Sequence, residues 1–120
     1  MPRPSRIFGA LAVTLVTALL LLAPATSRSD QVEEKKLIDN AEVLVMEFVF
    51  PPGFRGEEHE APVNEFAYVL EGEFAVVTKG TGKRVVRRGE VEWAPRGAIH
   101  YSLNESGEPA RVLVVLLKEK

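Results

Sequence analysis

The two histidines of this 120-residue chain, His59 and His100, lie in separate segments that glycine and proline punctuate. A glutamate, Glu65, follows the first histidine a few residues later. Imidazole nitrogens and carboxylate oxygens are common ligands of transition metals in proteins. A chain that uses histidine so sparingly, and places both copies in strand-like segments, therefore has the pattern of one metal centre inside a small β-barrel.

The spacing of these residues also favours convergence. Neighbours two apart on an extended strand point to the same face. His59, Ala61 and Glu65 share one parity, and His100 shares a parity with Asn104. Proline is often found at bulges, and a bulge at Pro62 would change whether Glu65 shares a face with His59 and Ala61.

The two segments resemble the paired motifs of the cupin superfamily, G-x5-H-x-H-x3-4-E-x6-G and G-x5-P-x-G-x2-H-x3-N. The second motif is matched at every fixed position, namely Gly89, Pro95, Gly97, His100 and Asn104. The first is matched at Gly53, His59, Glu65 and Gly72. It departs at Ala61, which stands where the motif has its second histidine. The closest type is a small, single-domain, exported cupin of the cupin-2 kind.

The resemblance implies an all-β fold, a small antiparallel β-barrel of the double-stranded β-helix or jelly-roll type. It also implies that His59, Glu65 and His100 bind a divalent transition metal: Fe, Mn, Ni, Cu or Zn. Two imidazoles and one carboxylate match the facial triad of non-haem Fe(II) sites and also catalytic Zn sites. The alternative is a degenerate cupin without metal, although an unpaired carboxylate inside an apolar barrel is costly.

The first 25 residues are predicted to be a secretory signal peptide. Arg3 and Arg6 precede an apolar run from Ile7 to Ala23, and small residues follow at Ala23-Pro-Ala25. This order predicts cleavage after Ala25 or Ser27 and an exported, periplasmic or extracellular protein. An uncleaved membrane anchor is the alternative, because the run approaches the roughly 20 residues that span a bilayer. Residues 26–36 are then expected to form a polar tether, and residues 37–117 the cupin β-barrel domain.

Alternating patterns and Gly or Pro turns predict strands at residues 41–50, 65–70, 73–79, 83–88, 90–94 and 111–117. The first and last of these are apolar on both faces, which indicates strands covered once by the barrel core and once by a neighbour. Large apolar residues beside the centre are expected to form the wall that binds substrate: Met46, Phe48, Tyr68 and Trp93.

Composition limits the class of partner. The chain has no cysteine and a net charge of −2, with no basic stripe that would indicate nucleic acid. A domain of this size often completes its core by dimerising, so a homodimer is expected. The membrane is expected to matter only through the N-terminal segment, if that segment is uncleaved.

Three functions compete. The first is a metal-dependent, dioxygenase-like enzyme acting on a small chelating molecule such as a phenol or dicarbonyl. The second is a non-enzymatic module that binds a sugar, an organic acid or another small molecule at a degenerate metal site. The third is a structural dimer with a vestigial pocket. The residues leave open whether the protein is an enzyme.

Overall fold

Nine β-strands and no helix occur in residues 31–120, the part of the chain that the computed structural model describes. The strands are β1 (Glu33–Asp39), β2 (Val43–Phe50), β3 (His59–Glu60), β4 (Asn64–Glu71), β5 (Glu73–Thr78), β6 (Gly82–Arg87), β7 (Val91–Ala94), β8 (Ile99–Leu103) and β9 (Ala110–Leu117). The predicted signal peptide, residues 1–25, lies outside the described residues. Within residues 31–120, no helix is long and apolar enough to cross a membrane.

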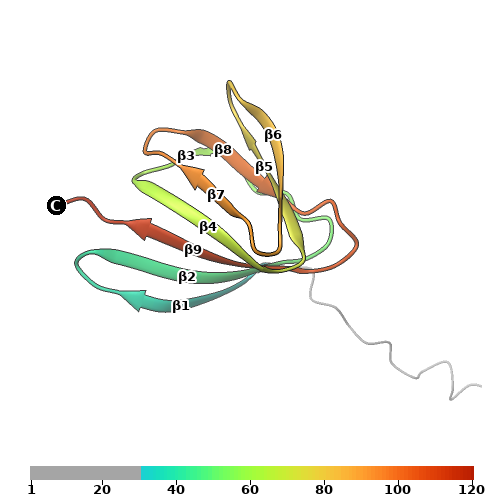
Figure 1. Cartoon of the computed structure of the whole chain (residues 1–120), viewed down its shortest axis with the longest axis horizontal. Coiled ribbons are helices and arrows are strands. Elements are labelled where there is room, and N and C mark those ends of the chain that lie inside the picture. The colour runs from blue at the N-terminus through green and yellow to red at the C-terminus, as the bar shows by residue number, and fades with distance from the viewer. Residues whose placement is uncertain (1–30) are drawn as a thin grey trace, which may run out of the picture.

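The strands form two antiparallel sheets that face each other (Figure 1). One sheet has five strands in the order β1-β2-β9-β4-β7, and the other has four in the order β3-β8-β5-β6. Strands distant in sequence are therefore neighbours, as β9 is inserted between β2 and β4. The prediction of an all-β antiparallel fold of the jelly-roll type is confirmed.

The hydrophobic core joins the two sheets at the end of the barrel where β2 ends and β9 begins. Val69, Val86 and Val112 are completely buried there, on β4, β6 and β9. The ring of Phe50 stacks on two further phenylalanines, with centroids 4.8 Å from Phe54 and 5.7 Å from Phe74. Burial of these side chains holds the two sheets together at this end.

Strand β1 corrects the predicted domain boundary. Residues 33–36 were expected to belong to the polar tether, yet they pair with β2 from Glu33 opposite Val49 onward. All seven residues of β1 are exposed, and the strand lies at the edge of its sheet. Charged residues are common on edge strands, where they discourage further pairing. A strand of this kind gives no alternating apolar signal in the sequence, which is why it was assigned to the tether. Its pairing with β2 means that the barrel begins earlier than residue 37.

The end of β1 is tied to the end of β9. Lys118 donates a hydrogen bond of 2.6 Å to the carboxylate of Asp39, and Lys36 donates one of 3.2 Å. The hydrogen bond from Lys118, with a smaller contribution from Lys36, holds the pKa of Asp39 below its usual value. The remaining predicted strands agree with the structure to within about two residues at each end, for example β4 at residues 64–71 against 65–70.

Two motif residues fix turns. Gly72, between β4 and β5, has φ of +75°, and a Cβ atom there would lie 2.5 Å from the carbonyl oxygen of Pro109. Asn104 is fully buried and donates hydrogen bonds to the carbonyl oxygens of Phe50 (3.0 Å) and Glu108 (2.8 Å). Its Oδ1 accepts from the backbone N–H (2.9 Å) and hydroxyl (2.6 Å) of Ser106. Asn104 therefore braces the loop between β8 and β9.

We expect Asn104→Ala to lower the free energy of unfolding by about 2–4 kcal/mol, because it removes the hydrogen bonds that this buried side chain donates and accepts. The matched control is Asn64→Ala, since the exposed Asn64 side chain accepts one hydrogen bond, from the backbone N–H of Arg96. That variant should lose about 1 kcal/mol or less. Urea denaturation monitored by circular dichroism measures both values. Equal losses in the two variants would contradict the bracing role.

Candidate metal centre

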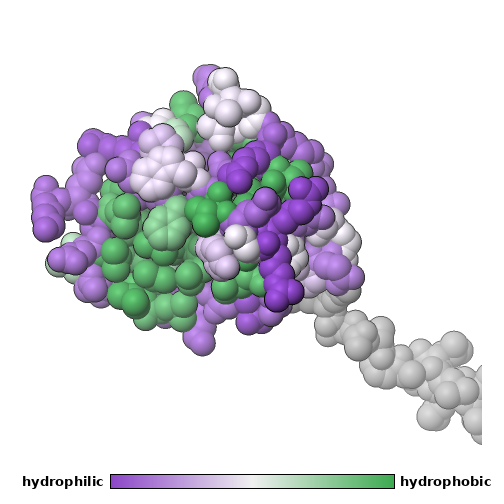
Figure 2. Space-filling model, viewed as in Figure 1, coloured by the Kyte–Doolittle hydropathy of each residue, from purple (hydrophilic) through white to green (hydrophobic). Residues whose placement is uncertain are grey.

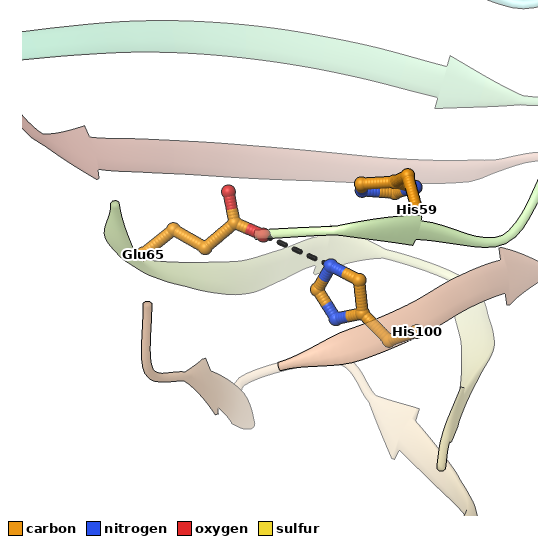
Figure 3. A group of neighbouring side chains, drawn as sticks. All are labelled: His59, Glu65 and His100. Atoms are coloured by element: carbon orange, nitrogen blue, oxygen red, sulfur yellow. Dashed lines mark ion pairs between the residues drawn. The ribbon is translucent and has the colours of Figure 1, made fainter. Parts of the chain in front are cut away.

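Three strands from both sheets bring the histidines and the glutamate together. His59 on β3 and His100 on β8 are direct partners in the antiparallel register of the four-stranded sheet. Glu65 lies on β4 of the other sheet, opposite Ala94 of β7. Closure of the barrel then places the carboxylate beside the histidine pair, where it points toward His100, as Figure 3 shows. The site therefore exists only when the two sheets face each other.

The geometry of this group suits one metal ion. One ligand atom from each of His59, Glu65 and His100 can be chosen so that all three lie within 4.8 Å of one another. The Nε2 atom of His100 is 3.2 Å from Oε1 of Glu65, and the two imidazole centroids are 4.7 Å apart. Ligand atoms bonded to one ion at about 2.0–2.2 Å lie no more than about 4.4 Å apart, so a small movement of the side chains would complete the site.

The tautomer of His59 is also suitable. Its Nδ1 is 3.0 Å from the carbonyl oxygen of Glu57, which can only accept a hydrogen bond. Nδ1 therefore carries the proton, and the lone pair of Nε2 is free to bind a metal. A backbone carbonyl in this role is a usual partner of metal-binding histidines, because it fixes the orientation of the ring.

Burial differs across the group. The side chains of His100 and Glu65 are only 10% and 15% exposed, whereas His59 is exposed. His59 thus marks the side that faces solvent. Ala61 is buried, with 1% exposed, and is not among the residues that line the adjoining cavity. The donor set in the described residues therefore comprises two imidazoles and one carboxylate.

A cavity of about 810 Å³ adjoins the three residues. Its wall is largely apolar, and much of it is aromatic or aliphatic, including Phe48, Phe50, Phe54, Phe74, Val76, Val114 and Leu116. The polar side chains of the wall are those of the three candidate ligands and of Glu34, Arg55, Glu57, Glu92 and Ser102. A concave apolar cavity with a few polar groups is typical of a small-molecule site.

The structure agrees with only part of the predicted substrate-binding wall. Phe48 lines the cavity, and Met46 does not, although it lies on the same face of β2. The expected positions of Tyr68 and Trp93 are wrong. Their side chains are 38% and 51% exposed, and neither lines the cavity. They alternate with inward residues on β4 and β7, so they point to the outer face of the five-stranded sheet.

The sequence did not single out Glu92, Phe54 or Phe74 as site residues. The side chain of Glu92 is only 15% exposed, and its Oε2 accepts a hydrogen bond of 2.5 Å from Nη1 of Arg84 on β6. That ion pair joins the edges of the two sheets beside the cavity. The alternating pattern of residues 90–94 could have identified Glu92 as a site residue, because Glu92 lies on the same face of the strand as the inward Ala94.

The family profile described as "Cupin domain" matches residues 46–116, more than half of the chain. The chain belongs to the cupin family. The matched range includes both histidines and Glu65, so the resemblance noted in the sequence is confirmed. Cupins often bind metal, and this cupin has a group that could hold one. No curated protein sequence matches the chain.

Solved structures support the fold. The DMSP lyase DddQ of Ruegeria pomeroyi DSS-3 is similar with a TM-score of 0.69 and 21% identity over 75% of this chain. This cupin spans about half of that protein, 48% of its length. The TT1209 protein of Thermus thermophilus has a TM-score of 0.69 and 27% identity, covering 83% of this chain and 95% of its own.

A third similar structure is the polyketide cyclase RemF of Streptomyces resistomycificus. It has a TM-score of 0.67 and 30% identity, covering 73% of this chain and 66% of its own length. A lyase and a cyclase thus share this fold. The fold by itself does not decide the reaction.

Removing the carboxylate should abolish metal binding. We expect Zn²⁺ or Mn²⁺ at about 100 times its dissociation constant to raise the melting temperature by roughly 10 °C or more, because it binds only the folded state. Glu65→Gln and His100→Ala should each remove this response. Glu60→Gln is the matched control, since Glu60 is exposed on β3 outside the donor set and should leave it intact. The protein must carry no histidine tag. A full response in Glu65→Gln would exclude this ligand set.

Proposed function

We propose that this cupin is exported, binds a divalent transition metal through His59, Glu65 and His100, and acts as a dioxygenase-like enzyme on a small chelating molecule. The observation that carries this proposal is the convergence of the three ligand atoms within 4.8 Å of one another beside a cavity of about 810 Å³. A homodimer is part of the proposal, because a domain of this size exposes a large share of its apolar surface.

The protein residues perform distinct tasks in this proposal. When bound, the metal supplies Lewis-acid chemistry for the oxygen atoms of a substrate. Three protein ligands leave coordination positions open, which a chelating substrate needs. The phenyl groups of Phe48, Phe54 and Phe74 bury the apolar part of the substrate and displace water from the cavity. Glu92, held by Arg84, can accept a hydrogen bond from a substrate hydroxyl group.

The residues of the cavity wall also indicate which class of small molecule could bind there. Sugars present hydroxyl groups over most of their surface, and each buried hydroxyl requires a hydrogen-bond partner. The cavity wall is mostly apolar and carries several aromatic rings, so a planar or apolar molecule with a pair of oxygen donors fits it better than a sugar. Phenols and dicarbonyl compounds have this chemistry. The lyase and cyclase named above are small-molecule enzymes of the same fold, which supports an enzymatic function.

Elemental analysis of tag-free protein, followed by oxygen uptake with catechol, tests the function. We expect about one equivalent of Fe, Mn, Ni, Cu or Zn per chain, and dioxygen consumption that requires both metal and catechol. If the protein binds metal but consumes no oxygen, the dioxygenase chemistry is wrong and the metal centre is still supported. Absence of metal, with none restored on titration, would contradict the enzyme and favour the alternative of a non-enzymatic binding module.

Filling the cavity should separate substrate binding from metal binding. Ala67 lines the cavity, two residues along β4 from Glu65. We expect Ala67→Phe to weaken catechol binding about tenfold or more, because the added ring occupies the space of the ligand, while the metal response of the melting temperature persists. Val77→Phe, on the outer face of the other sheet, is the control. Calorimetric titration measures both affinities; unchanged binding in Ala67→Phe would place the ligand outside this cavity.

Export is tested by the N-terminus of the mature protein. We expect the full chain, expressed in a bacterium with two membranes, to be recovered from the periplasm beginning at Thr26 or Arg28. Leu15→Arg should prevent this, because a charge interrupts the apolar run that the secretion machinery recognises. N-terminal sequencing provides the measurement. Membrane-bound protein that still begins at Met1 would support the anchor instead.

A further inference from the structure

Two carboxylates face the cavity from neighbouring strands of the five-stranded sheet. Glu65 of β4 lies opposite Ala94 of β7, and Ala67 of β4 lies opposite Glu92 of β7. All four residues line the cavity, so the two glutamates are diagonal neighbours on the inner face of the sheet. Diagonal neighbours in an antiparallel pair are about 7–8 Å apart, a distance that long side chains can span. A molecule held beside Glu65 therefore lies within reach of Glu92.

The other diagonal of this group consists of two alanines. The methyl groups of Ala67 and Ala94 cover the sheet between the two carboxylates, and both residues line the cavity. A larger side chain at either position would fill the space between Glu65 and Glu92. An apolar floor between a few polar groups is the arrangement that orients a small ligand. The position of Glu92 therefore suits contact with a ligand as well as with Arg84.

One oxygen of the Glu92 carboxylate is held by the protein, and the other faces no donor. Oε2 accepts a hydrogen bond of 2.5 Å from Nη1 of Arg84, which also donates to the carbonyl oxygen of Val91 at 2.9 Å. No hydrogen bond within residues 31–120 reaches Oε1 of Glu92. The side chain of Glu92 is only 15% exposed. A buried carboxylate oxygen without a donor is unfavourable, and a hydroxyl group of a ligand would supply that donor.

The positive charges near Glu92 are directed away from the cavity. The side chain of Arg84 is 50% exposed and is not part of the cavity wall. Figure 2 shows hydrophilic side chains on the surface over β6 and the turn that follows it. Arg55 is the arginine of the cavity wall, and its guanidinium group donates to the hydroxyl of Tyr101 at 3.2 Å and lies 4.5 Å from the ring centroid. A ligand beside Glu92 therefore meets a hydrogen-bond acceptor and not a cation.

We propose that Glu92 is a specificity-determining residue, which accepts a hydrogen bond from a hydroxyl group of the substrate and excludes molecules that present a carboxylate there. Arg84 is a positioning residue that orients Glu92. This inference rests on the proposed function and narrows its substrate class to uncharged chelators with a hydroxyl group, such as a phenol or the enol of a dicarbonyl compound. A carboxylate beside Glu92 would bring two acceptors together without a proton between them, and burying like charges together is costly.

Two aromatic ligands with paired oxygen groups test this selectivity. Catechol has hydroxyl groups on neighbouring ring carbons, whereas phthalate has carboxylates there and no hydroxyl group. Calorimetric titration of the tag-free protein loaded with Zn²⁺, which has no redox chemistry, measures both dissociation constants. We expect catechol to bind at least tenfold more tightly than phthalate. Elemental analysis after each titration checks that the protein has kept its Zn²⁺.

Substitutions of the ion pair should change this preference. Glu92→Gln keeps the size of the side chain, removes its charge and adds an amide donor. We expect it to weaken catechol binding about tenfold, and to bind phthalate as tightly as the wild type or more tightly. Arg84→Gln should change both constants in the same direction by a smaller factor, and Arg84→Lys should restore part of the preference. Glu73→Gln is the matched control, because it removes a carboxylate 3.7 Å from Arg87, outside this cavity, and should change neither constant.

The results distinguish this role from a purely structural one. An ion pair that only joins the sheet edges would alter the melting temperature of Glu92→Gln and change the two dissociation constants by the same factor or not at all. Either result would overturn the specificity role and leave the metal centre supported. Loss of Zn²⁺ binding in folded Glu92→Gln, checked by circular dichroism, would also overturn it. If the Zn²⁺-loaded wild type does not bind catechol, both this inference and the substrate class of the proposed function are wrong.

Discussion

The carboxylate of Glu65, held in an apolar cavity, is the constraint on which the site depends. Its side chain is 15% exposed, and the nearest basic group is Nε2 of His100 at 3.2 Å. Burying a charge is costly unless it is paired or bound to a metal. Glu65 and His100 come from different sheets, so their interaction requires that the sheets close. A cation held between them would compensate the buried charge more fully than a neutral imidazole can.

Two sets of contacts hold the two sheets of the barrel together. Stacked phenylalanine rings around Phe50, together with the buried hydrogen bonds of Asn104, join the sheets at one end. The same rings also line the cavity, whose wall continues toward the polar groups of the metal centre. Arg84 and Glu92 join the sheet edges there with an ion pair, where apolar packing would fill the cavity. The core and the cavity therefore share one aromatic wall.

The sequence predicted the fold and the candidate ligands because glycine, proline and histidine occupy fixed positions in two motifs. Gly97, for example, has φ of +90°, a conformation that other residues rarely adopt. Alternation shows which residues share a face of a strand, but not which face is inside when both are apolar. That limit explains the errors at Tyr68 and Trp93. Strand β1 was missed because an exposed edge strand can be mostly charged, as five of the seven residues of Glu33–Asp39 are.

Strand β4 shows why these errors matter for function. Its inward residues include Glu65 and Ala67, which border the cavity, while Tyr68 alternates with them and lies on the outer side of the sheet. The small side chain of Ala67 leaves room for the cavity on the inner face, and the ring of Tyr68 is partly exposed on the outer face. A shift of register by one residue would exchange the two faces of the strand and move Glu65 out of the metal centre. The hairpin turn at Gly72, which admits no side chain, helps to prevent that shift.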